Sequence, residues 1–142
     1  MENTAKLSPQ LEEAVRRYRQ WFGSYKASGE LKRIQVWLTL KDGCIEFLTP
    51  ADSYKVKRVL SNPHVVCFLG TESGPAISGM AEIVVDPDSL WRVYRAYWKT
   101  HPIMMGVFSA SIRRRIKDGR QIVIRVHPYE HDVLAGITDP PL

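Results

Sequence analysis

The chain has 142 residues, a formal net charge of +5 and 44% hydrophobic residues, and its pI is about 9.4. These values are typical of a globular protein large enough to bury a core, so we expect a single domain over residues 1–142. No apolar run is long enough to span a membrane, and the polar start, Met1 to Lys6, is not a signal peptide. The sequence therefore predicts a cytoplasmic protein without a membrane partner.

The first predicted elements are a helix and a strand. Ser8 and Pro9 suit the N-cap and the first position of a helix. Apolar residues at the helical period follow: Leu11, Ala14, Val15, Tyr18 and Phe22. Residues 22–27 also suit a first strand, which a turn at Ser28 and Gly29 would end.

A hairpin is predicted next. Apolar and polar residues alternate over residues 34–40, as in a half-buried strand. Asp42-Gly43 is a strong signal for a hairpin turn, and residues 44–48 form the returning strand. Cys44 in this strand and Cys67 in a later one have neither metal nor redox spacing, so we expect two reduced, buried thiols.

The turn and helix start within residues 47–58 predict an anion site. A strand runs into a hydroxyl-rich turn, which runs into a short helix that opens with cations. Backbone N–H groups at a helix start, hydroxyls and cations together suit a phosphate dianion. The candidate side chains are Thr49, Ser53, Lys55, Lys57 and Arg58.

Helix capping is the competing interpretation of the same turn. Thr49 and Asp52 fit a capping box, with Pro50 at the first helical position, and this needs no ligand. Capping does not explain Lys55 and Lys57, because cations in the first turns oppose the helix dipole.

The short helix is predicted to place Val56, Val59 and Leu60 on one face and to end at Asn62-Pro63. Residues 65–69 are continuously apolar, as in a strand buried on both faces.

The second half of the chain contains a turn, a strand and the clearest helix. Residues 70–75 form the turn and residues 76–85 the strand, in which Gly79 indicates a bulge or a close backbone approach. A helix follows from Asp86 and stops at Pro102. Its apolar face follows the helical period: Leu90, Val93, Tyr94, Tyr97 and Trp98.

The last predicted elements are a weaker helix over residues 109–117, ending at Gly119, a strand over residues 121–126, and an irregular tail over residues 127–142. These elements together favour a mainly β (α+β) fold, a six-stranded antiparallel split β-barrel with flanking helices.

Three further patterns have structural explanations. The basic residues Arg113–Arg115, Lys117 and Arg120 carry isoleucines at helical spacing, which is typical of a solvated helix face, so we expect no nucleic-acid partner. Tyr94, Tyr97 and Trp98 could form an aromatic cofactor box, but at helical spacing they indicate core. His127 and His131 have a metal-ligand spacing only if helical, and Pro128 opposes a helix, so no metal site is predicted.

In their order and spacing, these segments resemble the split β-barrel flavin and deazaflavin oxidoreductases related to pyridoxamine 5′-phosphate oxidase. The resemblance runs from residue 34 to residue 85 and more weakly to residue 126. Residues 36–38, 42–43 and 47–49 match the family's central hairpin. Residues 51–58 and 62–65 match its phosphate-binding stretch, and residues 74–81 match its second hairpin.

The resemblance implies a homodimer with FMN or the deazaflavin coenzyme F-420 at the subunit interface, acting as an oxidoreductase on a small organic substrate. By position, Thr49, Ser53 and Lys55 match residues that bind the cofactor phosphate. Lys57 and Arg58 match the basic extension of the deazaflavin-using branch, and Trp37 falls near the strand that lines the ring. No catalytic acid or base is implied, because hydride transfer at such a ring needs no protein nucleophile.

Departures from the family pattern limit what it implies. Tyr54 stands where the pyridoxamine oxidases usually have Arg, and residues 126–142 lack their pyridoxal-phosphate-reading Trp and Arg motif, so vitamin B6 oxidation is not expected. The Lys-x-Lys-Arg run favours the deazaflavin slightly over FMN. A non-catalytic flavin- or haem-binding protein on the same barrel is the alternative, and fold alone does not exclude it. A third hypothesis is a basic nucleic-acid module acting through residues 113–120.

Overall fold

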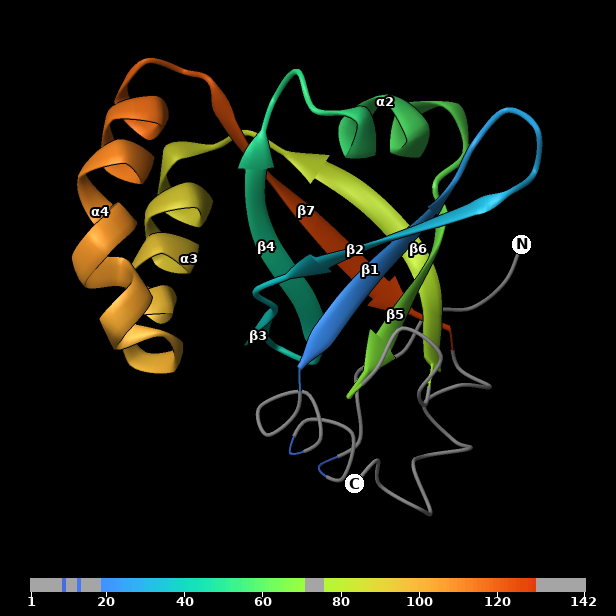
Figure 1. The fold of residues 1–142 in the computed structure, drawn as a ribbon, viewed down its shortest axis with the longest axis horizontal. Coiled ribbons are helices and arrows are strands. Elements are labelled where there is room, and N and C mark those ends of the chain that lie inside the picture. The colour runs from blue at the N-terminus through green and yellow to red at the C-terminus, as the bar shows by residue number, and fades with distance from the viewer. Residues whose placement is uncertain (1–8, 10–12, 14–18, 71–75, 130–142) are drawn as a thin grey trace.

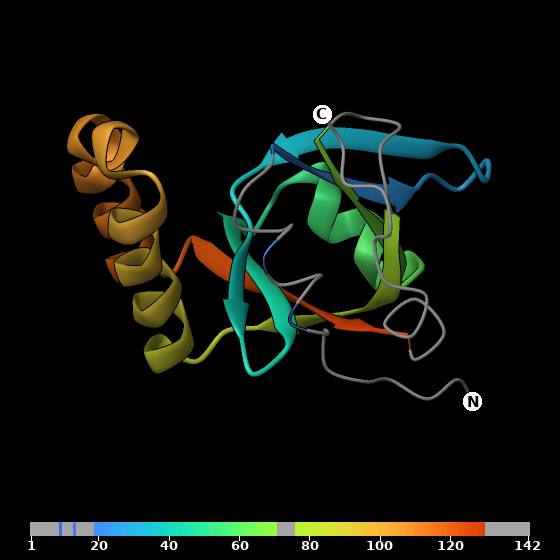
Figure 2. The ribbon, with the colours of Figure 1, turned by 90° about the horizontal axis from the view of Figure 1, so that it is seen from below.

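The computed structural model describes residues 9, 13, 19–70 and 76–129. Within them, seven strands form one antiparallel sheet of order β2-β1-β5-β6-β7-β4-β3. The strands are β1 (Gln20–Tyr25), β2 (Leu31–Val36), β3 (Thr39–Lys41), β4 (Cys44–Pro50), β5 (His64–Leu69), β6 (Ala76–Val84) and β7 (Gln121–Pro128). The sheet curls into a half-open barrel flanked by helices α2, α3 and α4 (Figure 1, Figure 2). The predicted split β-barrel is confirmed, with one strand more than expected.

The extra strand arises because the predicted strand over residues 34–40 is two strands. β2 pairs with β1 and β3 pairs with β4, and these two short strands are the opposite edges of the sheet. Trp37 and Leu38 carry the chain from one edge to the other. Leu38 is buried in the barrel core, whereas Trp37 packs against Tyr97 outside it. The two residues between β2 and β3 therefore connect one edge strand of the sheet to the other.

Helix α2 (Tyr54–Ser61) lies across one end of the barrel (Figure 1). Val56 and Val59 enter the barrel core as predicted, but Leu60 is 72% exposed, because this short helix contacts the barrel along a single narrow side. The capping-box interpretation is wrong. Ser53 is the N-cap, whereas Thr49 and the neighbouring proline belong to β4.

Helices α3 (Pro87–Thr100) and α4 (Pro102–Lys117) form a hairpin beside the barrel (Figure 2). Asp86 caps α3 as its sequence predicts, accepting a hydrogen bond from the Ser89 backbone N–H at 3.0 Å. α4 begins at Pro102, not at residue 109. Proline suits the first position of a helix, so the residue that stops α3 also starts α4. The arginines of α4 are exposed, as expected for a solvated helix face.

The two faces of the sheet bury different residues, because side chains alternate along each strand. In β4, Ile45 and Phe47 belong to the barrel core. Leu48 packs in a second cluster, in which buried residues of α3 and α4 cover outward-facing residues of β6 and β7: Val84, Leu90, Val93, Tyr97, Met105, Ile116 and Val123. The sheet is thus covered on both faces around β4 and β7.

Several predictions fall outside the described residues: most of the N-terminal helix, the turn over residues 71–75, and the tail from residue 130 on. The tail prediction is wrong at His127 and Pro128, which extend β7, because β6 continues alongside them and pairs with both. In the part of the chain that the structure describes, no helix is both long and apolar enough to cross a bilayer.

Gly79 makes the close backbone approach that its place in a strand predicts. It pairs with Pro128 across β6 and β7. A Cβ atom on Gly79 would lie 2.6 Å from the His127 carbonyl oxygen and 2.8 Å from Val126 Cγ1. At Gly106, inside α4, a Cβ atom would be unobstructed, because apart from the backbone of the helix itself no described atom lies within 4 Å of its position.

Gly79→Val should therefore lower the free energy of unfolding by about 3 kcal/mol or more, at or beyond the upper end for overpacking, because the obstructing atom is backbone. The matched control, Gly106→Ala, should raise it by about 0.5–1 kcal/mol, since alanine is a better helix former than glycine. Denaturant unfolding of both variants measures this. A Gly79→Val variant as stable as wild type would contradict the close approach of β6 and β7.

Candidate functional site

The predicted hydroxyl pair meets where β4 leads into α2. The buried Thr49 hydroxyl donates a hydrogen bond to Ser53 Oγ at 3.2 Å. Ser53 Oγ also accepts a bond from the Val56 backbone N–H at 3.4 Å, which caps the helix. The two hydroxyls and the N-terminal N–H groups of α2 therefore share one corner of the barrel end.

Two predicted cations, Lys55 and Arg58, lie on the same helix. Arg58 Nε donates to Ser24 Oγ of β1 at 2.7 Å, while Arg58 Nη2 is buried with no hydrogen-bond partner among the described residues. Burial and the neighbouring Arg58 guanidinium lower the pKa of Lys55. Within the described part of the chain, no carboxylate pairs with either cation. Two desolvated like charges without a counter-charge are unfavourable, and an anion bound there would relieve them.

Lys57 and Trp37 are not part of this corner. Lys57 is on the exposed side of α2, where its ammonium lies 5.2 Å from the centroid of the Tyr54 ring. Trp37 belongs to the connection between β2 and β3, and this connection runs away from α2 (Figure 1). The structure thus joins Thr49 to Ser53 and places Lys55 near Arg58 on the same helix, and it separates Lys57 and Trp37 from both pairs.

Trp37 instead lines a groove of about 1080 Å³ between the β2–β3 connection and the C-terminal half of α3. Arg19, Arg92, Arg95 and Lys99 contribute positive charge to the lining, and no carboxylate is among the lining residues that the structure describes. A groove lined by one sign of charge concentrates ions of the opposite sign. This groove therefore suits an anionic ligand.

One wall of the groove is aromatic. The Trp37 indole stacks on the His101 imidazole, with ring centroids 4.5 Å apart and planes 12° apart. It also meets the Tyr97 ring edge-on at 5.2 Å. Burial lowers the pKa of His101, which favours the neutral ring. A flat, neutral aromatic surface beside a set of cations suits a planar, anionic molecule.

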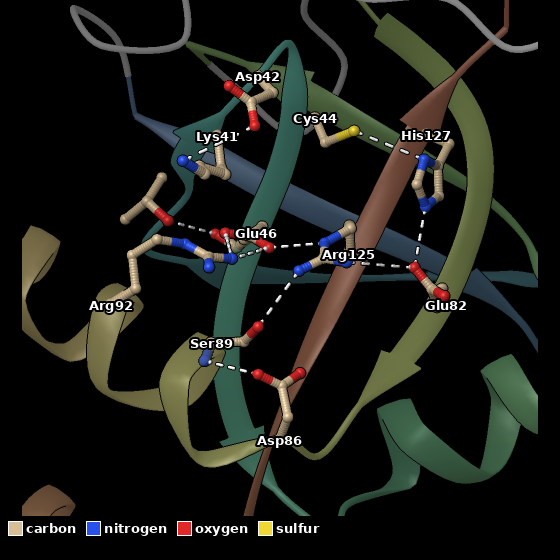
Figure 3. A network of polar contacts seen from close by, with 11 residues as sticks. Lys41, Asp42, Cys44, Glu46, Glu82, Asp86, Ser89, Arg92, Arg125 and His127 are labelled. Carbon is tan, nitrogen blue, oxygen red and sulfur yellow. Dashed lines mark hydrogen bonds and ion pairs between the residues drawn. The ribbon is translucent and has the colours of Figure 1, made fainter.

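A buried carboxylate that the sequence did not single out fixes α3 against the barrel (Figure 3). Glu46 on β4 is 1% exposed. Both of its oxygens accept hydrogen bonds from Arg92 Nη2 of α3, at 2.9 and 2.8 Å, and one also accepts from Arg125 Nε of β7 at 2.7 Å. Arg92 lines the groove as well. The only sequence signal for this network is an acidic residue in the middle of an apolar strand.

The structure gives different outcomes for the predicted aromatic core residues and for the two histidines at metal-ligand spacing. Tyr97 is core, as predicted, and its hydroxyl oxygen accepts a bond from the Leu48 backbone N–H at 2.8 Å. Burial raises the pKa of this hydroxyl. Trp98 is not core, being 42% exposed, because it follows the last buried turn of α3. His127 lies on a strand, His131 lies outside the described residues, and no metal-binding cluster of three or more His, Cys, Asp or Glu residues occurs among those described.

Comparison with known proteins gives similarity at the level of structure. No family model matches the sequence. No curated protein matches it either. Protein Rv2991 from Mycobacterium tuberculosis aligns with a TM-score of 0.67 at 19% identity, over 93% of this chain and 89% of that protein.

Two other solved structures have the same fold. An F-420 reductase aligns with a TM-score of 0.54 at 17% identity, over 82% of this chain and 91% of that one. A candidate pyridoxamine 5′-phosphate oxidase from Listeria innocua aligns with a TM-score of 0.58 at 16% identity, over 83% and 93% of the two chains. The chain therefore has the split β-barrel fold of the pyridoxamine 5′-phosphate oxidase-like proteins, as the sequence resemblance implies.

Glu46→Gln tests whether this carboxylate fixes α3. We expect the free energy of unfolding to fall by about 3 kcal/mol, the lower end for breaking a buried ion pair, because both arginines stay partly exposed. Glu30→Gln is the matched control. That carboxylate is exposed and lies 3.4 Å from Lys26 Nζ, so its loss should cost less than about 1 kcal/mol. Equal, small effects in denaturant unfolding would show that Glu46 is dispensable.

Proposed function

We propose that the protein is a cytoplasmic oxidoreductase that binds a phosphorylated flavin-type cofactor, either FMN or the deazaflavin coenzyme F-420. It would transfer hydride or electrons between this cofactor and a small organic substrate. Two facts support the proposal: the fold, shared with an F-420 reductase and a candidate pyridoxamine 5′-phosphate oxidase, and the set of donors at the start of α2.

The observation that carries the proposal is the buried Arg58 Nη2, next to Lys55, which has no hydrogen-bond partner in the described part of the chain. Such a donor is costly unless a ligand accepts its hydrogen bond. A phosphate would accept from it and neutralise both cations. Ser53 adds a hydroxyl donor, which the hydrogen bond from Thr49 positions, and the N-terminus of α2 adds backbone N–H groups. The donors present therefore fit a phosphate group.

The division of labour between cofactor and protein follows from these residues. The bound cofactor would supply the hydride chemistry, as flavins and deazaflavins do. Lys55, Arg58, Thr49 and Ser53 would hold its phosphate. Lys57, exposed on the same helix, would attract the anion at longer range. The groove at Trp37 would bind a planar, anionic group, either the cofactor ring or the substrate.

The direct test is a titration of the purified protein with FMN and with F-420, followed by fluorescence and by visible absorption. Binding of either, and turnover with a reducible organic acceptor, supports the proposal. Binding without turnover would instead identify a non-catalytic flavin carrier. Absorption by haem, with no response to flavin or deazaflavin, would overturn the cofactor assignment.

Lys55→Ala should weaken cofactor binding without unfolding the protein. A charge-assisted hydrogen bond is worth roughly 1.5–3 kcal/mol, which corresponds to about ten- to 150-fold in affinity. Wild-type affinity should also fall as salt rises, because part of the attraction is screened.

Arg113→Ala is the control for Lys55→Ala, since it removes an exposed cation from a different helix. It should bind the cofactor as wild type does. If Lys55→Ala also binds with wild-type affinity, the start of α2 is a capped helix end and not a phosphate site.

A homodimer is the second part of the proposal. Four apolar residues of α4 are exposed: Ile103, Met104, Val107 and Phe108. They follow directly after Lys99 to His101 of the groove lining. Exposed apolar patches on soluble proteins mark interaction sites, and most soluble oligomers are twofold dimers. We infer that a second copy covers this side of α4, beside the groove.

Val107→Glu places a charge in that patch and should shift the protein from dimer to monomer, because an unpaired charge is costly in an apolar interface. Lys117→Glu, at the exposed end of the same helix, should leave the dimer intact. Light scattering at micromolar concentration measures both. A wild-type protein that is monomeric with cofactor present would refute the dimer.

A further inference from the structure

A thiol, an imidazole and a carboxylate lie in a row on the outer face of the sheet, outside the groove and the α2 corner (Figure 3). Cys44 Sγ lies 3.5 Å from His127 Nδ1. His127 Nε2 lies 3.0 Å from Glu82 Oε1. None of these contacts takes part in the proposed cofactor site.

The row is produced by strand order and not by closeness in sequence. β7 lies between β4 and β6 in the sheet. Cys44 is therefore beside His127 although 83 residues separate them, and His127 is beside Glu82 across 45 residues. Regular antiparallel strands fix the positions of these side chains better than loops would.

The hydrogen bonds give each group a chemical role. A carboxylate only accepts hydrogen bonds, so Glu82 holds the imidazole tautomer whose proton is on Nε2. The lone pair on Nδ1 then faces the Cys44 thiol. A nucleophile next to a base that a third group orients is the arrangement of activated nucleophiles in enzymes.

The charges around the thiol make a base necessary. Burial raises the pKa of Cys44, and Glu46, Asp42 and Glu82 raise it further, against the lowering effect of Arg125. The thiol is thus protonated at neutral pH and needs an acceptor for its proton when it reacts. Cys67 is a built-in comparison. It is fully buried, and burial raises its pKa to about 12.

We propose that Cys44 is a nucleophilic thiol that forms a mixed disulfide with low-molecular-weight disulfides, with His127 as its base and Glu82 as a positioning residue. In the reaction, the Cys44 proton passes to His127 Nδ1 while the sulfur attacks one sulfur of the disulfide. The disulfide S–S bond breaks as the new S–S bond forms. The departing thiolate takes the proton from His127, so the products are the mixed disulfide and one free thiol.

The test is the rate at which glutathione disulfide modifies the full-length protein, measured by intact mass and located by peptide mapping. Wild type should gain one glutathione, on Cys44 and not on Cys67. His127→Gln should react about 100-fold more slowly, at the lower end of what a positioned general base contributes. Glu82→Gln should also slow the reaction, to a smaller extent.

The control is Asp42→Asn, which makes the same carboxylate-to-amide change next to Cys44 without touching His127. Asparagine tolerates the positive φ of 51° at this position. This variant should react as fast as wild type or faster, because it removes a charge that raises the thiol pKa.

The pH profile separates catalysis from a structural effect. With the imidazole as base, the wild-type rate should rise at a pH below the range in which the thiol ionises by itself. In His127→Gln the rise should move to the alkaline range of the thiol itself. If His127→Gln does not fold, Glu82→Gln gives the same comparison. A rate and pH profile unchanged by both variants, or equal labelling of Cys67, would overturn the proposal.

Discussion

The ion pairs of Glu46 with Arg92 and Arg125 determine much of the architecture around the groove. A carboxylate on the outer face of β4 would normally be solvated, yet α3 covers it completely. Burying a charge without partners costs several kcal/mol, so α3 is stable against β4 only in a position that pairs Arg92 with Glu46. This requirement fixes α3 relative to β4, and the following turns of α3 then form one wall of the groove.

The same outer face links the groove to the thiol. Arg125 contacts Glu46 at 2.7 Å and lies 3.6 Å from Glu82, which in turn holds His127. Because these side chains share partners, a change at one should alter the electrostatics of its neighbours, as coupled networks do. The Cys44 thiol is therefore influenced by charges whose first function is to dock a helix.

Local sequence signals predicted local structure well. The Asp42-Gly43 turn has positive φ values of 51° and 79°, and Asp86 caps α3 as expected. Features set by distant pairing were not predictable. The break at Trp37 exists because β2 and β3 join opposite edges of the sheet. Nothing within residues 34–40 specifies those edges.

The candidate sites follow the same division. Lys55 and Arg58 are three residues apart, so at 3.6 residues per turn they share a side of α2, while Lys57 points elsewhere. Cys44, His127 and Glu82 come from three different strands, and no spacing in the sequence predicts that they lie together. Thr49 and Cys44 lie towards opposite ends of β4, about 17 Å apart at strand rise. Thr49 and the Cys44 thiol therefore lie on the same strand but too far apart for direct contact. Modification of Cys44 should accordingly leave phosphate binding at the start of α2 unchanged.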